Sequence, residues 1–435
     1  MLSEKVENPA AAEAAHRASF FRQSGWLMVA NIGGGMLMWG VHLLNKALPP
    51  GQYGSFGAFL TVVMLLPTIP LQMIMTQQAA KALATDRRGE LSCLIRFVWA
   101  GTTLLWCLGA GVLLIWQKNI LAALNMTDVV GLWVTAFVVL LSLWMPMFWG
   151  ALQGAQNFLW LGWSMLSNGI GRITVSVVAV LLLHAYAAGM MGGVLVGVTL
   201  AAGIGGWVTR SLWLAPSKTF DWRGILQQVT PLMLGFLGFQ ILFTADTLFV
   251  KHYFTGGTVD FYVSAGTMSR ALMWLVLPLS AVMFPRLVHS AARSEKSNLL
   301  ALVLPGTAIL AAVGAVGLCL VGPFVVKLAY SEAYVKVATS VLPWYAGAMI
   351  PLALANVLLN NLLARPDSKL ALSLCVIVLA VGYMAALTHF HDSLVTVLKT
   401  MGIFNLGLLA VCAWFTWGSK VQSPESKAQS SDPRL

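Results

Sequence analysis

The sequence predicts an all-α integral membrane protein of about 12 transmembrane helices. Of its 435 residues, 58% are hydrophobic and 9% are charged, whereas soluble domains have roughly 25% charged residues. Apolar stretches of about 20 residues, the length that crosses a bilayer, recur along the whole chain. Backbone polar groups find no water in the bilayer core, so a span is either a helix or part of a closed barrel. The apolar stretches are continuous and do not alternate with polar residues, which favours helices.

The first six spans are expected at 24–47, 54–76, 92–116, 130–152, 163–186 and 189–213. Residues 1–23, which precede them, are mixed polar and Ala-rich. This stretch lacks the basic start, short apolar core and cleavage site of a signal peptide, so we expect a cytoplasmic N-terminal segment. Residues 24–214 are predicted to form an N-lobe, and 215–225 a cytoplasmic linker.

The last six spans are expected at 226–250, 259–284, 298–321, 338–362, 370–388 and 394–416. Residues 226–417 are therefore predicted to form a C-lobe. The remaining residues, 418–435, are polar and contain several Ser, Pro and Lys residues. Such a composition predicts a disordered cytoplasmic tail.

The distribution of Lys and Arg predicts the orientation of the spans. With the N-terminus inside, 18 Lys and Arg residues lie on the cytoplasmic side and 6 on the outer side, while Arg172 and Arg270 lie within spans. This threefold bias follows the positive-inside rule and places both termini in the cytoplasm. The net charge of +11 therefore reflects topology and does not indicate nucleic-acid binding.

A weak internal repeat relates the two halves. Lys46 ends the first span and Lys251 ends the seventh, and the cytoplasmic loop 81–88 corresponds to 286–296. The two sets of features are offset by about 205 to 211 residues. Six spans in each half give both halves the same orientation, so they are predicted to be parallel repeats. Transporters built in this way hold their substrate near the membrane midplane, between the repeats.

Three ionisable residues within spans stand out: Arg172, Asp246 and Arg270. Charges in the membrane are costly, and they mark functional sites by default. Guanidinium groups suit phosphate oxygens, so the arginines are candidates for a cationic cavity that binds an anionic substrate. Alternatively, one arginine pairs with Asp246 and locks helices together. Asp246 itself is a candidate for coupling or gating.

Weaker polar residues follow helical spacing in several spans. These residues are candidates for lining a hydrated cavity: Asn31, His42, Asn45, Gln72, Asn168, Gln240, Thr244, Asn356 and Asn360. The alternative is that they form modest hydrogen bonds between helices. His42 suits a hydrogen-bonding role better than that of a proton carrier. Lys46 and Lys251, at the outer ends of corresponding spans, complete the candidate cationic set.

Several kinds of chemistry lack a signal in the sequence. The five cysteines have no C-x-x-C neighbour, so no metal site is expected. No G-x-x-x-x-G-K-[ST] loop, G-x-S-x-G nucleophile or H-E-x-x-H pair is present. We therefore expect a protein that is not an enzyme, has no catalytic residue and binds no cofactor.

Three regions resemble a known family. The resemblance is carried by 150–158 (GALQGAQNF) with 167–172 (SNGIGR), by 246–251 (DTLFVK) with 262–270 and 277–286, and by 330–334 (YSEAY). These stretches are similar to polysaccharide transporters, the Wzx-like O-antigen and exopolysaccharide flippases of the multidrug/oligosaccharidyl-lipid/polysaccharide (MOP) superfamily. In that family the last motif usually begins with Phe-Gly, where this chain has Tyr330-Ser331.

The resemblance implies a MATE-like, V-shaped bundle of two six-helix lobes with a central cationic cavity. It implies that the chain flips undecaprenyl-pyrophosphate-linked oligosaccharide across the bacterial inner membrane by alternating access, for surface polysaccharide biosynthesis. Coupling to a proton or sodium gradient is expected. Arg172 and Arg270 match the lumenal arginines, and Asp246 with Lys251 matches the charged end of the seventh span. The implied partners are an anionic lipid-linked glycan and membrane lipids, with a polysaccharide polymerase and a chain-length regulator as further candidates, and no nucleic acid.

Other functions are weighed against this interpretation. Twelve spans instead of fourteen argue against the lipid II flippase branch. A MATE-like ion-coupled drug or cation antiporter needs an acidic lumen, whereas this chain has two intramembrane arginines and one aspartate. A membrane-embedded polyprenyl-glycan polymerase or ligase would carry a long outer loop, and the loops here are short. A purely structural membrane protein needs no charges at mid-membrane.

Overall fold

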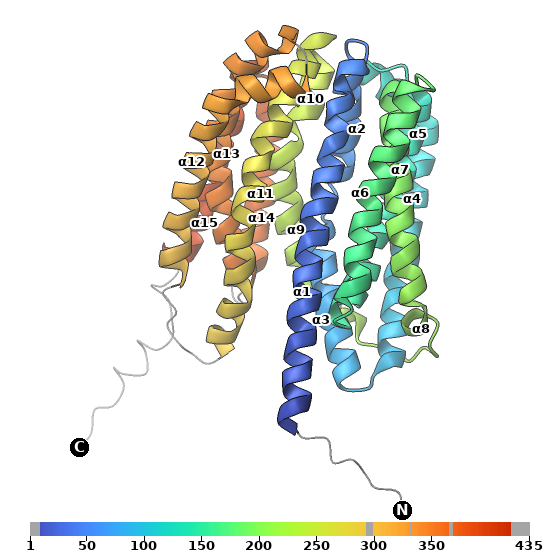
Figure 1. The fold of residues 1–435 in the computed structure, drawn as a ribbon. Coiled ribbons are helices and arrows are strands. Elements are labelled where there is room, and N and C mark those ends of the chain that lie inside the picture. Colours follow the sequence, from blue (N-terminus) through green and yellow to red (C-terminus); the bar gives the residue numbers. More distant parts are fainter. Residues whose placement is uncertain (1–8, 293–298, 331, 365–368, 419–435) are drawn as a thin grey trace, which may run out of the picture. The chain divides into compact units, whose positions relative to one another are not determined.

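The computed structural model describes residues 9–292, 299–330, 332–364 and 369–418. Every regular element in these residues is a helix (Figure 1). Eleven helices of the searched residues are long and apolar enough to cross a membrane. The remaining predicted span, 259–284, lies in a helix that runs without interruption from Gly257 to Ala292. The predicted all-α membrane fold is confirmed, and the predicted tail from residue 419 lies outside the described residues.

The chain divides into two compact units, Met1–Ile225 and Leu226–Leu435, called unit 1 and unit 2 below. The helices of unit 1 are α1 (Pro9–Gly40), η1 (Val41–Ala47), α2 (Gln52–Met64), α3 (Thr68–Ala84), α4 (Arg88–Ala123), α5 (Val129–Gly154), α6 (Phe158–Leu181), α7 (Tyr186–Val208) and α8 (Arg210–Trp213). The helix of the first span begins at Pro9, so the part of the predicted N-terminal segment that the structure describes is helical.

The first two spans of unit 1 are not single α-helices. The first changes from an α-helix to the 3₁₀ helix η1 at Val41. The second is interrupted between Met64 and Thr68, where Pro67 stands. Proline has no N–H to donate and disfavours the α conformation of the residue before it, which accounts for this break. By contrast, Pro146 lies inside the continuous helix α5.

The helices of unit 2 are α9 (Trp222–Thr244, which begins just before the boundary), α10 (Asp246–Tyr253), α11 (Gly257–Ala292), α12 (Leu299–Ala329), α13 (Glu332–Ala364), α14 (Lys369–Leu387) and α15 (Leu394–Trp417). The seventh span is divided at Ala245 into α9 and α10. Its second part begins at Asp246, and the second part of the first span begins at Val41. The two positions differ by 205 residues, as Lys46 and Lys251 do, so these second parts have corresponding places in the two halves of the sequence.

Small residues bring the helices of unit 1 close together. Helix α6 packs against α1 and α7, its neighbours in Figure 1. A Cβ atom on Gly34 of α1 would lie 2.9 Å from the Met165 carbonyl oxygen of α6. At the contact between α6 and α7, a Cβ atom on Gly197 of α7 would meet the backbone of Asn168 of α6. Glycines therefore set both helix spacings, as is common where membrane helices pack.

Candidate functional site

In each unit an arginine lies near the middle of a membrane span. Arg172 belongs to α6 of unit 1 and Arg270 to α11 of unit 2, and each is 9% exposed. A guanidinium keeps its charge in proteins, so its cost in the membrane depends on what surrounds it. The two arginines differ in whether an acidic side chain pairs with them.

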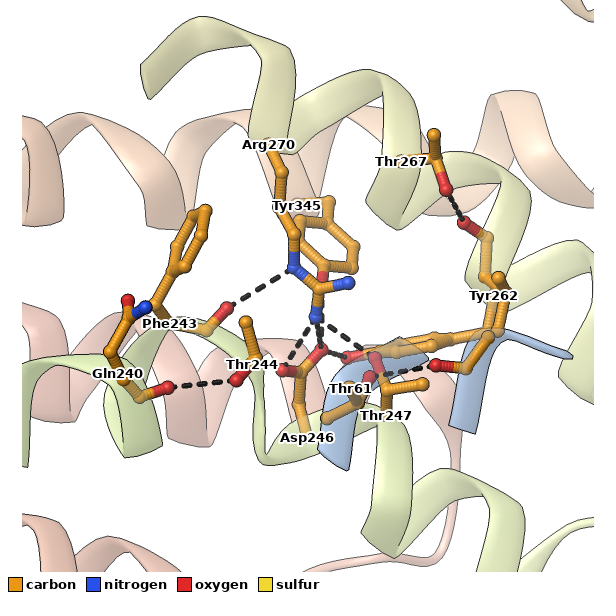
Figure 2. A network of polar contacts seen from close by, with 12 residues as sticks. Thr61, Gln240, Phe243, Thr244, Asp246, Thr247, Tyr262, Thr267, Arg270 and Tyr345 are labelled. Atoms are coloured by element: carbon orange, nitrogen blue, oxygen red, sulfur yellow. Dashed lines mark hydrogen bonds and ion pairs between the residues drawn. The ribbon is translucent and has the colours of Figure 1, made fainter. Parts of the chain in front are cut away.

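Arg270 is bonded to groups of its own unit. Figure 2 shows its guanidinium between Asp246, Thr247 and the backbone of Phe243. Nη2 donates to Asp246 Oδ1 at 2.8 Å and Oδ2 at 3.0 Å, and to Thr247 Oγ1 at 2.9 Å. Nε donates to the Phe243 carbonyl oxygen at 3.1 Å. The ring of Tyr345 lies on the same guanidinium, 5.5 Å from its centroid to Cζ.

The carboxylate of Asp246 is fully enclosed by this network. Besides Arg270, it accepts hydrogen bonds from two tyrosines at Oδ2, from Tyr262 at 2.7 Å and from Tyr345 at 2.6 Å. Asp246 and both tyrosines have no exposed surface. These residues join α10, α11 and α13, and we call Asp246, Tyr262, Arg270 and Tyr345 the Asp246 cluster. Within this cluster the buried positive charge is matched by a negative one.

The interruption of the seventh span builds part of the Asp246 cluster. A helix leaves its last carbonyl groups without partners from its own turn. Because α9 ends at Thr244, the Phe243 carbonyl is available to Arg270. Asp246 opens α10, and its negative charge is favourable at a helix start. One local break thus supplies both a carbonyl and a carboxylate to the same guanidinium.

Arg172 has no such partners. No hydrogen bond or ion pair joins its guanidinium to another of the described residues, and its Nε atom is buried without a partner. A neighbour on the same helix face, Asn168, has a buried Oδ1 that also lacks a partner. The arrangement leaves a positive charge in the membrane part of unit 1 that the described residues do not neutralise.

The first span packs against α6 near Arg172, because a Cβ atom on Gly40 would lie 2.9 Å from Ile173 Cδ1, and His42 of η1 follows two residues after Gly40. His42 Nδ1 shares a hydrogen bond of 2.7 Å with the hydroxyl of Tyr53 on α2, whose ring stands edge-on to the imidazole. His42 is 7% exposed and Tyr53 is not exposed at all. The 3₁₀ helix η1 and α2 therefore hold the imidazole of His42 in a buried position of unit 1.

The rest of the polar series on α6 joins helices. Ser164 Oγ donates to the Ala201 carbonyl oxygen at 2.9 Å, and Ser176 Oγ donates to that of Met190 at 3.3 Å. Both acceptors belong to α7. Ser164 and Ser176 therefore fit the alternative of interhelical bonding, whereas Asn168 and Arg172, which lie between them on α6, retain unpaired atoms.

The other predicted site residues occupy varied surroundings. Buried positions are held by Asn45, Asn168, Thr244, Lys251 and Asn356, partly buried ones by Gln72, Gln240 and Asn360, and exposed ones by Asn31 and Lys46. Lys251 interacts electrostatically with Asp260. Gln72 Nε2 donates to Gln153 Oε1 at 3.2 Å, which links α3 to the 150–158 motif on α5. Asn360 Nδ2 donates to Asn356 Oδ1 at 2.9 Å. Their exposure to a transport pathway stays a prediction.

Sequence reasoning did not assign roles to the tyrosines. Tyr53, Tyr262 and Tyr345 each bond an ionisable side chain within their unit. A signal was available, because the chain has only 8 tyrosines and these three fall within or beside predicted spans. A buried tyrosine needs a partner for its hydroxyl, so a tyrosine in a span points to a second polar group nearby.

Comparisons with known proteins add to this geometry. A family model described as "Lipid II flippase MurJ" matches residues 87–417, from the start of α4 to the end of α15. A search of curated proteins finds no match.

Several solved structures share the fold. An inward-facing multidrug resistance MATE family transporter of the MOP superfamily has a TM-score of 0.73 at 13% identity, over 91% of this chain and 96% of that one. Lipid II flippase MurJ in an inward closed conformation has a TM-score of 0.64 at 12% identity, over 91% of this chain and 87% of that one. An outward-facing MATE transporter has a TM-score of 0.62 at 14% identity, over 95% and 96%. Identities this low show likeness of fold alone.

Proposed function

Because this chain belongs to the lipid II flippase MurJ family, we propose that it translocates an undecaprenyl-pyrophosphate-linked glycan across the bacterial inner membrane by alternating access. A flippase is a transporter and not an enzyme. The span count argued against the lipid II flippase branch, and the family match outweighs that argument. The family match runs over α4 to α15, so it does not depend on the number of helices outside that stretch.

Two glycans are candidates for the cargo. The family model favours a lipid II-type glycan. The motifs at 150–158 and 246–251 favour the oligosaccharide unit of a surface polysaccharide, for which a polymerase and a chain-length regulator would be partners. Both cargoes share a polyprenyl chain and a diphosphate, so the proposal rests on those common parts.

The single observation that supports an anionic cargo is the unpaired guanidinium of Arg172. Arginine binds phosphate oxygens with several N–H groups in a fixed geometry. The buried carboxylates argue against a cationic drug as cargo, because Asp246 is paired with Arg270 and Asp260 interacts with Lys251. A drug or cation antiporter would need a carboxylate that is available to its substrate.

The remaining charged residues receive supporting roles in this proposal. The Asp246 cluster ties α10, α11 and α13 together and would act in gating, since it can open only if a buried ion pair is separated. Lys46 and Lys251, which end the outer parts of corresponding spans, would attract the diphosphate on the outer side. Both termini would lie in the cytoplasm, as the Lys and Arg distribution predicts.

Transport in proteoliposomes tests the proposed function. Purified protein is reconstituted with a fluorescent undecaprenyl-pyrophosphate glycan, and the fraction that a membrane-impermeant quencher reaches is followed over time. We expect faster exchange between leaflets than in protein-free vesicles, for lipid II, for the oligosaccharide-linked lipid or for both. A fluorescent phosphatidylethanolamine serves as the control cargo and should not be translocated faster.

Two results would contradict the proposal. Equal exchange rates with and without protein for both glycans would refute flipping of this class of cargo. Gradient-driven efflux of a cationic dye in the same vesicles, without glycan exchange, would identify the antiporter alternative instead. Analysis of the recovered lipids for longer glycans would reveal a polymerase.

A further inference from the structure

We propose that Gln72, Thr76 and Gln153 of unit 1 form an uncharged site that binds hydroxyl groups of the cargo glycan on the cytoplasmic side. These three residues are called the amide site below. The inference rests on the proposed function, since it assigns the sugar part of the cargo to a particular place. It goes beyond that function, which rests on the polyprenyl chain and the diphosphate alone.

The amide site is built where two glycines of α5 bring this helix against α3. A Cβ atom on Gly150 would lie 2.9 Å from the Gln72 carbonyl oxygen, and one on Gly154 would lie 2.7 Å from that of Thr76. The side chain of Gln153 therefore reaches α3, where its Oε1 lies 3.2 Å from Gln72 Nε2 and 3.2 Å from Thr76 Oγ1. Close backbone packing thus fixes the amide of Gln153 relative to that of Gln72.

The two amides keep unused hydrogen-bonding groups whichever way they are turned. With Gln72 Nε2 as the donor, the Gln153 NH₂ group and the Gln72 Oε1 have no partner among the described residues. If both amides are turned over, Gln153 Nε2 donates to Gln72 and to Thr76, whose hydroxyl in turn donates to the Gln72 carbonyl oxygen at 2.8 Å. The Gln72 NH₂ group and the Gln153 oxygen then remain unused. Either arrangement presents one NH₂ group beside one carbonyl oxygen.

These unused groups are accessible, and the helices around them carry little charge. Gln153 is exposed, and Gln72 and Thr76 are partly buried. Amide groups that faced hydrocarbon without partners would be costly, so this face requires water or a polar ligand. Helix α5 has no charged residue, and the first one in α3 is Lys81. The amide site therefore suits an uncharged polar ligand better than a phosphate.

A sugar hydroxyl matches this pattern, because it can accept from an N–H group and donate to a carbonyl oxygen at the same time. Helix α3 ends at Ala84, and the positive-inside rule places the loop 81–88 in the cytoplasm. The amide site would thus meet the glycan on the side from which the cargo is loaded. Gln153 gives the 150–158 motif a role in binding besides its role in helix packing.

Binding of two lipids of equal charge to the protein in nanodiscs tests the inference. One probe is an undecaprenyl-pyrophosphate-linked disaccharide, and the other is the methyl ester of undecaprenyl pyrophosphate, a diphosphate diester without sugar. The ratio of their affinities isolates the contribution of the sugar. We expect the wild type to bind the disaccharide lipid about threefold to tenfold more tightly, the range for one or two neutral hydrogen bonds. This ratio should be the same at low and high salt, because the site carries no charge.

Variants assign the contribution of the sugar to the amide site. Gln153→Met and Gln72→Met each remove an amide and keep a side chain of similar length. Each should bind the two lipids with nearly equal affinity, while its affinity for the methyl ester stays at the wild-type value. Gln77→Met is the matched control, because Gln77 is an exposed glutamine of the same helix α3 outside the amide site, and it should keep the wild-type ratio. Thermal unfolding identifies the variants that are folded.

The outcomes separate the two proposals. Equal binding of both lipids by the wild type, or the wild-type ratio in a folded Gln153→Met or Gln72→Met variant, would overturn the amide site and leave the flippase function intact. An equal loss of affinity for both lipids would give these glutamines a structural role only, and would overturn the amide site as well. Failure of the wild type to bind either lipid would overturn the proposed function itself. If one of the two variants does not fold, the other decides the question.

Discussion

Asp246 has both carboxylate oxygens engaged, by Arg270 and by the hydroxyls of Tyr262 and Tyr345. Taking two charges out of water costs several kcal/mol per ion, and hydrogen bonds from further groups help to offset that cost. The pair therefore persists because the tyrosines complete it. Of the two arginines that could have paired with Asp246, the structure shows that Arg270 does so. Arg172 has a buried Nε without a partner.

Removing one partner of this pair should destabilise the protein. Arg270→Gln leaves the carboxylate of Asp246 buried without its counter-ion, and Asp246→Asn does the same to Arg270. Each single variant should lose about 3–5 kcal/mol in free energy of unfolding, and the double variant should lose less than the sum. Thermal unfolding in detergent, followed by tryptophan fluorescence, measures the effect.

Lys46→Gln is the control for this series, since Lys46 is exposed and its replacement should leave the unfolding temperature nearly unchanged. Strictly additive losses in the double variant would refute a coupled pair. Because Arg270 forms a buried ion pair with Asp246, an Arg270 variant could lose transport through unfolding. The unfolding measurement distinguishes that cause from a loss of substrate binding.

At the scale of the helices, α7 holds α6 in place through glycines. A Cβ atom on Gly193 would lie 2.5 Å from the carbonyl oxygen of Arg172. One on Gly197 would lie 2.8 Å from Asn168 Oδ1 and 3.1 Å from Arg172 Cβ. The carbonyl oxygen and Cβ of Arg172 cannot move aside by a rotamer change, and neither can the Asn168 carbonyl oxygen, which a Cβ on Gly197 would also meet. The position of Arg172 is therefore set by the close approach of two helices.

Gly197→Ala should push α6 and α7 apart at the level of Arg172. We expect a loss of about 1–3 kcal/mol in free energy of unfolding, the usual cost of overpacking, together with weaker binding of the lipid-linked sugar. The matched control is Gly192→Ala on the same helix, where an added Cβ meets no atom within 4 Å. Equal stability and equal affinity of the two variants would contradict the role given to Gly197.

At the scale of the whole molecule, the orientation in the membrane is a prediction that labelling can check. In a chain whose five native cysteines are replaced by alanine, Lys46→Cys and Lys81→Cys place single thiols at exposed positions of unit 1. A membrane-impermeant maleimide added to spheroplasts should label Lys46→Cys alone, because the positive-inside rule puts loop 81–88 in the cytoplasm. The reverse labelling pattern would invert the proposed topology.

The class of fold and the places of the spans followed from the sequence because hydrophobicity over about 20 residues is a local property. Each of the twelve predicted spans overlaps one or two helices of the described residues, although the fifth, 163–186, runs past the end of α6 at Leu181. Interruptions were harder to predict. Pro67 coincides with a break, yet Pro146 does not, and the division at Ala245 has no proline at all. Whether a helix bends depends on which neighbour can satisfy the freed backbone groups, as Arg270 does for Phe243.

The sequence by itself determined that this protein crosses the membrane repeatedly, that its halves correspond, and that Arg172, Asp246 and Arg270 are the charges to explain. Only the tertiary structure decided which of these charges meet. Asp246 could have paired with either arginine, and hydropathy and helical spacing are equal for both choices. Contacts between side chains of different helices depend on the packing of those helices, so the pairing of Arg270 and the unpaired Nε of Arg172 came from the fold.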